Sequence, residues 1–467
     1  MPDSADVIDY FIRFPNLGIA SLAGSLARHD AKILDLVLYR PNIRQRLKRV
    51  LADFRPDVVG LSAMTFQFDT LLRVARLVRE FDPDIRLVAG GYHVTLLARE
   101  LTASKRPVPL DFLVRGEGEA TIQELLDELA QPTPDLGRIR GLSYRNGNGW
   151  AHNPDRPLLD ADQVPLPRRQ ARLAGGFYLL GSSVDVAETS RGCPFDCKFC
   201  SIKHMYGQTF RPFSPERVIA DLQSIRSQGT RGVFFADDNI TYDAGHFRAV
   251  CDAIVQSGLN DLFYATQVSA TGIARDPGLV TIMARANFRI VFVGFESMDP
   301  ARLKHMKKPA SPDINVRAAA LLRQHNMAVV AGCIVGHPED TAASVARQYR
   351  MIVKLRPDVI YAQYLTPYPK TPLREELLAA GLVANERDFS TYDGFSCNIR
   401  TRHLSRRALY RALKKEAVRA FFTPALSANN YFLKNYRLPF LRAAGKAFLT
   451  NVFNVVAARQ RVPRMGI

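Results

Sequence analysis

The sequence predicts two successive α/β domains followed by a mainly helical C-terminal region. Short apolar runs rich in β-branched residues alternate with amphipathic stretches between about residues 7 and 130, and again between about 184 and 380. Such alternation indicates parallel βαβ units with right-handed crossovers. The 467 residues suffice for about three structural units, and the 47% hydrophobic content supplies their cores.

Residues 1–131 are expected to form a doubly wound, Rossmann-like sheet. Its strand candidates are residues 7–14, 32–38, 57–63, 85–89 and 111–114. Ligands of such sheets bind beyond the carboxyl ends of the strands. Glycine at such an end lets a flat ligand approach the main chain, although each turn alone also fits an ordinary tight turn. The candidate cofactor-binding residues at these ends are Ser62, Thr65, Gly90, Gly91, His93, Gly116 and Glu117.

Residues 132–181 are interpreted as a proline-punctuated linker with a small hairpin near residues 141–149. The second α/β domain is expected over residues 182–385. Six strand–helix units are too few to close an eight-stranded barrel. Their strand candidates are residues 184–188, 232–236, 262–268, 290–295, 328–335 and 359–365.

Three of the six cysteines, Cys193, Cys197 and Cys200, are packed into eight residues with the spacing C-x3-C-x2-C. Three thiolates on one loop can each bind one iron of a cubane iron–sulfur cluster and leave the fourth iron open. The alternative is a zinc knuckle, which needs a fourth protein ligand; His204 is the nearest candidate. The cluster is the favoured hypothesis. Cys251 and Cys333 are expected to be small core residues, and Cys397 is unassigned.

The cysteine spacing, with the aromatic Phe199 before the last cysteine, resembles the radical S-adenosylmethionine (radical SAM) superfamily. The resemblance implies a partial (β/α)6 barrel of the TIM type over residues 182–385. It also implies that S-adenosylmethionine binds the open iron of a [4Fe–4S] cluster and is cleaved reductively to a 5′-deoxyadenosyl radical. An electron donor such as flavodoxin or ferredoxin would supply the electron.

The strand ends of the second domain carry further residues similar to that family's S-adenosylmethionine site. Residues 332–339 match the adenine-binding pattern G-x-I-x-G-x-x-E at all four fixed positions. Asp237 and Asp238 stand where the family binds the amino group, although a helix N-cap is an equally good interpretation of either. Glu296 and Ser297 resemble the ribose and carboxylate contacts. The candidate contacts are Phe199, Asp237, Asp238, Gln267, Glu296, Ser297, Gly332, Ile334, Gly336 and Glu339.

The first domain resembles the cobalamin (vitamin B12)-binding domain that precedes the barrel in one large subgroup of radical SAM enzymes. Four segments carry the resemblance: residues 15–18, 33–35, Gly-Gly-Tyr-His at 90–93 and Arg-Gly-Glu-Gly-Glu at 115–119. The Asp-x-His-x-x-Gly loop that ligates cobalt in other B12 domains is absent, so the lower axial ligand is unassigned. His93, interpreted as a surface histidine, is a candidate for contacting the corrin or merely a hydrogen-bonding neighbour.

The formal net charge of +18 is concentrated in the C-terminal region, 386–467. Residues 401–467 contain fourteen Lys and Arg but only one acidic residue, Glu416. Helices are expected over residues 405–422 and 446–458, the latter amphipathic. Its apolar face either packs on the barrel or contacts an anionic membrane surface; nucleic acid is less favoured. The cysteine usage, with neither a secretory signal nor a transmembrane run, predicts a cytoplasmic protein, with the inner membrane face as the place of any such contact.

Two enzymatic functions are compatible with these motifs. The favoured one is a cobalamin-dependent radical SAM methyltransferase acting on an unactivated carbon of a small-molecule or lipid-like substrate. The other is a cyclase, ring-contracting or oxygen-inserting enzyme of the anaerobic porphyrin cyclase type. A tRNA methylthiotransferase is disfavoured because no cysteine precedes Cys193. A non-catalytic binding module would need neither an open-iron loop nor an adenine motif.

Overall fold

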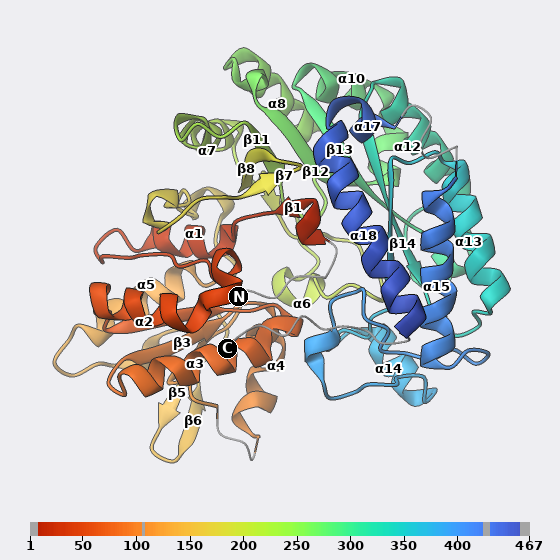
Figure 1. Ribbon diagram of the computed structural model, residues 1–467. Coiled ribbons are helices and arrows are strands. Elements are labelled where there is room, and N and C mark those ends of the chain that lie inside the picture. The colour runs from red at the N-terminus through yellow and green to blue at the C-terminus, as the bar shows by residue number, and fades with distance from the viewer. Residues whose placement is uncertain (1–7, 105–107, 424–429, 458–467) are drawn as a thin grey trace.

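The computed structural model describes residues 8–104, 108–423 and 430–457. Two sheets form the body of the molecule, and each has its own helices (Figure 1). The N-terminal sheet has the order β2-β3-β4-β5-β6, and the second sheet the order β1-β7-β8-β11-β12-β13-β14-β15. A third, two-stranded sheet joins β9 (Ser190–Arg191) to β10 (Arg211–Pro212).

The N-terminal domain is doubly wound, as predicted. Leu87 and Ala89 of β3 belong to the core under α2, α3 and α4, whereas Val88 faces the core under α1 and α5. The strands are β2 (Val58–Ser62), β3 (Arg86–Gly90), β4 (Phe112–Val114), β5 (Leu142–Asn146) and β6 (Gly149–His152). The helices are α1 (Leu17–Ser25), α2 (Ile43–Phe54), α3 (Phe68–Phe81), α4 (Tyr92–Thr102) and α5 (Glu119–Leu129).

Two predicted strands of this domain are wrong. Of the predicted strand 7–14, the described residues 8–14 contain only β1 (Ile12–Arg13), which pairs with β7 (Tyr178–Leu179) in the other sheet. Residues 32–38 contain a single bridge at Ile33, after which the Asp35 carboxylate accepts a hydrogen bond from the Val37 N–H and starts a 3-10 helix. An Asp side chain that caps a helix competes with strand pairing.

The hairpin expected inside the linker is present, but it belongs to the first sheet. Its strand β5 pairs antiparallel with β4, and β6 continues the edge. Residues beyond 131 therefore extend the N-terminal sheet.

The second sheet is the open barrel that six strand–helix units predict. Its six parallel strands are β8 (Ser182–Ala187), β11 (Gly232–Phe235), β12 (Phe263–Ser269), β13 (Phe288–Glu296), β14 (Ala328–Val335) and β15 (Val359–Tyr364). The helices that follow are α7 (Pro215–Ser227), α8 (Ala244–Gln256), α9 (Ala270–Arg275), α10 (Pro277–Arg285), α11 (Pro300–His305), α12 (Pro312–Gln324), α13 (Ala342–Lys354) and α14 (Pro372–Ala379).

Side-chain N-caps explain why the barrel helices were predictable. Ser214, Asp243, Ser311 and Thr341 each accept a hydrogen bond from a backbone N–H of the first helical turn. Pro follows Ser214 and Ser311 directly, where a missing N–H costs nothing. Cys251 and Cys333 lie in the core between these helices and the sheet, as expected.

The C-terminal region is helical. Helix α15 (Arg406–Phe421) confirms the first predicted tail helix, and the second is part of the longer α18 (Arg437–Ala457), which follows α17 (Tyr431–Asn435). Residue 458 lies outside the described part of the chain. Phe432 and Phe440 pack with Phe11 at the sheet edge formed by β1 and β7. In Figure 1, α18 lies beside α15 across the front of the barrel. Within the described ranges, no helix combines the length and apolar character needed to cross a bilayer.

Candidate active site at the junction of two sheets

The cysteine loop begins at a turn that only glycine can make. Gly192 has a φ of +89°, and a Cβ there would lie 2.5 Å from the Thr209 carbonyl oxygen. The Gly192 N–H donates to Asp238 Oδ2 at 2.9 Å. Farther along, the main chain of Lys198 donates to Met306 O at 3.0 Å and accepts from Leu373 N at 3.2 Å. The loop is thus held to the barrel on both sides of Cys197.

The three thiols of the loop fit a cluster better than a single metal ion. Burial raises the pKa of Cys197 to about 11 and of Cys200 to about 12, so their thiolates need a strong positive charge nearby. Asn239 Nδ2 donates to Cys193 Sγ at 3.7 Å. In the described part of the chain, no three His, Cys, Asp or Glu side chains are arranged to bind one metal ion, and the zinc alternative with His204 has no support. A cubane places each thiolate on a different iron, so the three need not converge.

Asp237 and Asp238 follow β11 but have different surroundings. Asp237 is buried and accepts hydrogen bonds from Thr189 N and Oγ1 and from Ser190 Oγ at 2.6–3.1 Å. Gln267 Nε2 donates to the Asp237 carbonyl at 2.9 Å. The Asp238 carboxylate accepts a hydrogen bond from the Gly192 N–H, and burial raises its pKa to about 6. Of the two, Asp238 is the one available to a ligand's amino group.

Glu296 ends β13 with a φ of +58°, and its carboxylate is paired with a residue that sequence reasoning missed. Lys308 Nζ donates to Glu296 Oε1 at 2.9 Å, and both side chains are largely buried. Burial opposes the charge on Lys308, but Glu296 and the thiols of Cys197 and Cys200 raise its pKa. A Cβ at Gly294 would lie 2.6 Å from Glu296 Oε1, so this glycine makes room for the ion pair. Twelve residues and a helix separate the partners in sequence, and no motif marks Lys308.

The adenine-motif residues are divided between the site and the protein interior. Ile334 belongs to the same apolar cluster that Phe199 of the cysteine loop packs against. Gly332 is needed because a Cβ would lie 2.6 Å from the Phe292 ring. Gly336 has a φ of +98°, and a Cβ there would lie 2.8 Å from Ile399 of the C-terminal region.

Two predicted contacts point elsewhere. The Glu339 side chain is 70% exposed and pairs with Arg402 at 2.7 Å and His403 at 3.5 Å. The Ser297 hydroxyl is fully buried, donates to Gln348 Oε1 at 3.2 Å and accepts from the Asp299 N–H. Both residues therefore support the fold around the site, and neither is offered to a ligand.

The strand ends of the N-terminal domain face the cysteine loop. Helix α4, which starts at the Gly90-Gly91 turn, packs against α6 (Lys203–Tyr206) of that loop. Burial, together with the charges of Asp238, Tyr206 and Cys200, raises the pKa of Tyr92, which places this phenol beside the cysteine loop. Tyr92 was missed because a tyrosine after two glycines carries no distinctive pattern.

Some of the residues in this domain that were predicted to contact the corrin are instead engaged in contacts within the protein. Gly91, with a φ of +92°, is required because a Cβ would lie 2.8 Å from the Ala63 carbonyl and 3.0 Å from Ser62 Oγ. Thr65 is buried at the start of a short 3-10 helix. Among the described residues, Gly90 has no atom closer than 3.5 Å to a Cβ position, and Gly116 has none within 4 Å. The open main chain therefore lies at Gly90 and Gly116.

His93 is not the surface residue that the sequence suggested. It is 1% exposed, and its ring lies 4.3 Å from Phe68 and 5.3 Å from Phe389, centroid to centroid. Burial lowers its pKa to about 4, so the imidazole is neutral at pH 7. Within the described part of the chain, its Nδ1 atom has no hydrogen-bond partner.

Glu117 is also committed to protein partners. Its carboxylate accepts from Arg191 Nη1 at 3.0 Å and Arg211 Nη2 at 2.7 Å, and from the Leu159 N–H at 3.1 Å. The prediction that Glu117 contacts a cofactor is therefore not carried further. The turn that contains it joins the two domains next to the cysteine loop.

Comparison with known proteins defines the class. Residues 187–352 match the radical SAM superfamily, and residues 7–126 match the B12-binding domain. An uncharacterized methyltransferase of Pyrococcus horikoshii is 30% identical over 425 residues, which cover 90% of each chain. The chain therefore belongs to the radical SAM superfamily. Within that superfamily it is a cobalamin-dependent enzyme, with a B12-binding domain before the barrel.

More distant relatives have different reactions in their names. The anaerobic magnesium-protoporphyrin IX monomethyl ester cyclase of Rubrivivax gelatinosus is 26% identical, over 87% of this chain and 73% of its own. The hopanoid C-3 methylase of Methylococcus capsulatus is 28% identical, over 82% and 72%. The structure of the radical S-adenosylmethionine methyltransferase TsrM from Kitasatospora setae shares the fold, with a TM-score of 0.70 and 16% identity over 95% of this chain and 97% of that one.

The cofactors of the enzyme are those typical of its family: a [4Fe–4S] cluster, S-adenosylmethionine and cobalamin. The residues present fit them. Three buried or half-buried thiols on one loop would hold the cluster, and the Gly90 and Gly116 turns leave main chain open at the end of the B12-binding sheet. Both sets lie at the junction of the two domains.

Proposed function

We propose that the enzyme methylates an unactivated carbon of a hydrophobic, lipid-like substrate. The observation that carries this proposal is the meeting of the two strand-end sites. Arg191, two residues before Cys193, is ion-paired with Glu117, in the turn after β4. A methyl group carried by the corrin and a radical formed at the cluster would therefore arise on facing surfaces.

The residues are assigned the following roles. Cys193, Cys197 and Cys200 hold three irons, and Asp238 accepts hydrogen bonds from the amino group of S-adenosylmethionine. The Glu296–Lys308 pair orients the carboxylate and ribose end, while Ile334 contacts the adenine. Main chain at Gly90 and Gly116 approaches the corrin. When bound, the cluster supplies one electron for cleavage of S-adenosylmethionine, and the corrin supplies a methyl group.

The inner face of the barrel supports a hydrophobic substrate. Along β13, Val291, Val293 and Phe295 are buried against the outer helices, so the alternate residue Phe292 faces inward. Phe292 lies 5.4 Å from Tyr361 of β15, which lies 4.9 Å from Phe395, centroid to centroid. These half-buried aromatic rings offer apolar contact to a substrate. Among the relatives, hopanoid methylases of two organisms act on lipids by name.

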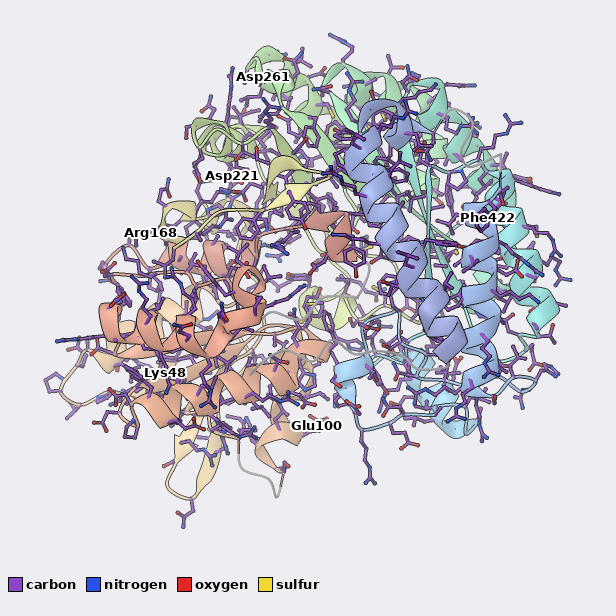
Figure 2. All side chains as sticks on the ribbon, in the orientation of Figure 1. Lys48, Glu100, Arg168, Asp221, Asp261 and Phe422 are labelled. Carbon is purple, nitrogen blue, oxygen red and sulfur yellow. The ribbon has the colours of Figure 1, made fainter. Side chains whose placement is uncertain are left out.

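The exposed side of α18 supports contact with the surface of an anionic membrane. Leu438, Leu441 and Leu449 share its exposed face, and Arg442 and Lys446 flank them. Phe422, labelled in Figure 2 at the end of α15, is also exposed and lies 5.5 Å from Phe448. Exposed leucines with flanking basic residues are typical of an interfacial helix. Replacing the three leucines with Ser should abolish co-sedimentation with phosphatidylglycerol vesicles, and unchanged binding would contradict the membrane assignment.

A cyclase reaction is the second candidate, favoured by the similarity to magnesium-protoporphyrin cyclases over most of the chain. The two functions differ in product. Anaerobic enzyme loaded with cluster and hydroxocobalamin would be given lipid and polar extracts with S-adenosylmethionine labelled in its methyl group. A product that gains one labelled CH2 supports methylation. A product without the label, formed with 5′-deoxyadenosine, would contradict it and favour the cyclase.

A further inference from the structure

A buried cluster of charges joins the turn after β4 to the start of the cysteine loop. Arg191 Nη1 donates to Glu117 Oε1 at 3.0 Å, and Nη2 donates to Glu119 Oε1 at 2.8 Å and to Ser21 Oγ at 3.3 Å. From its own side, Glu188 accepts from Arg191 Nη2 at 2.8 Å. One guanidinium therefore binds two carboxylates of the B12-binding domain and one of the barrel.

The cluster is closed to solvent. Arg191 is 7% exposed, Glu117 8% and Glu119 5%. Burial disfavours the charge on Arg191, but the neighbouring carboxylates raise its pKa, so it remains a cation. Arg211 Nη2 adds a second contact to Glu117 at 2.7 Å. Removing one partner from such a group leaves buried charge without compensation.

A short, rigid path links this cluster to the cofactors. Arg191 pairs with Arg211 in the β9–β10 ladder, which spans Ser190–Arg191 and Arg211–Pro212. Gly192 follows and binds Asp238 through its N–H, and Cys193 comes next. On the other side, Glu117 adjoins Gly116, whose N–H donates to Thr95 Oγ1 at 3.1 Å. Only Arg191 and Gly192 thus separate Glu117, in the turn of one domain, from the cluster ligand Cys193 of the other.

We propose that Arg191 is a positioning residue that holds the B12-binding domain in register with the cluster, so that methyl transfer to cobalt depends on its guanidinium while radical formation does not. The inference rests on the proposed function and goes beyond it. Each nitrogen of the Arg191 guanidinium donates to a carboxylate of the protein, so no direct role toward substrate or cofactor is assigned to it. It acts through Glu117 and Glu119 on the domain that carries the corrin. The planar fork of Arg suits three carboxylates, and Lys supplies the charge without the fork.

Radical formation and methyl transfer to cobalt can be measured separately, because each leaves its own product. 5′-Deoxyadenosine forms when one electron from the cluster breaks the C5′–S bond, releases methionine and leaves a 5′-deoxyadenosyl radical. That radical takes a hydrogen atom from a C–H group of the substrate or, without substrate, of an organic buffer component. S-Adenosylhomocysteine forms when the methyl group passes as CH3+ to cobalt(I), which is oxidised to cobalt(III); titanium(III) citrate supplies the electrons for both. Only the second product needs both domains in register.

The test compares Arg191→Lys with a matched control, Arg169→Lys. Arg169 is an equally buried arginine that binds Asp221 and Asp185 within the barrel side of the structure; Asp221 on α7 is labelled in Figure 2. With hydroxocobalamin and S-adenosylmethionine bound, Arg191→Lys should lower the ratio of S-adenosylhomocysteine to 5′-deoxyadenosine about tenfold. The control should keep the wild-type ratio. Without cofactors, hydrogen–deuterium exchange should rise about fivefold in residues 115–121 of Arg191→Lys only.

A second variant approaches the contact from the other domain. Glu119→Gln should lower the same ratio and expose the same segment. An unchanged ratio and unchanged exchange in both variants would overturn the proposal, as would equal loss of both products, which would assign Arg191 a general role in folding. If the wild type forms neither product, the proposed function fails, whereas exchange without cofactors still tests the contact.

Discussion

The two strand-end sites face each other but are built differently. On the barrel, Asp238, Glu296 and Lys308 place charged side chains beside the cysteine loop. On the B12-binding domain, the side chains of Glu117 and His93 are committed to protein contacts, and the main chain at Gly90 and Gly116 is left open. We therefore propose that the barrel recognises its ligands by charge, and the B12-binding domain by shape.

The largest effect is expected at the cluster. Anaerobically purified enzyme should contain about four irons per chain. Cys197→Ala should lose most of them, because the loop keeps only two thiols. The control is Cys251→Ala, which removes a buried thiol from the barrel core. Iron and sulfide assays decide the outcome, and full iron content in Cys197→Ala would refute the cluster assignment.

The next effect tests recognition by charge. Asp238→Asn should weaken binding of S-adenosylmethionine about ten- to a hundredfold, because the ammonium of the ligand then meets a neutral amide instead of a carboxylate. Asp237→Asn is the matched control, since donors from Thr189 and Ser190 already bind this carboxylate. We expect it to lower the melting temperature rather than the affinity. Calorimetric titration of the cluster-loaded enzyme measures both variants; equal losses of affinity would contradict the distinction.

The same contact should depend on pH. Burial raises the pKa of Asp238 to about 6, above the ordinary value of 3.8. Below that pKa the carboxyl is protonated and neutral, so affinity for the ammonium of S-adenosylmethionine should fall as pH drops from about 7.5 to about 5.5 and level off above about 7. Asp238→Asn should remove this dependence. An identical pH profile in the variant would assign the titration to another group.

Recognition by shape is tested at glycine. Gly116 has a φ of +72° and open space around its Cβ position, and so does Gly147 in the β5–β6 turn, with a φ of +55°. Ala at either position brings similar backbone strain. Gly116→Ala should lower the affinity for hydroxocobalamin about tenfold, and Gly147→Ala should not. Equal affinities in equilibrium dialysis would show that the corrin does not approach Gly116.

The barrel was predictable from sequence because its information is local. Its strands are short segments rich in apolar and β-branched residues, and side-chain caps such as Asp243 and Thr341 mark the following helices. The predictions that failed concern residues whose contacts are made with partners distant in sequence or with the local backbone. Asp35 begins a helix where apolar residues suggested a strand, and Glu339 pairs with the C-terminal region instead of the site. Lys308 could not be found, since only the folded chain brings it to Glu296.

The smallest effect is expected at His93. The sequence suggested a surface histidine that could contact the corrin, whereas the structure buries this side chain. Its neutral ring is enclosed by Phe68 and Phe389, and Nδ1 lacks a partner among the described residues, so Phe should replace it with a stability change under about 1.5 kcal/mol. Affinity for hydroxocobalamin in His93→Phe should stay within about twofold of the wild type. A larger loss, or a changed corrin spectrum, would show that the imidazole contacts the corrin. The B12-binding domain would then also recognise its ligand by a polar side chain, and the contrast with the barrel would fail.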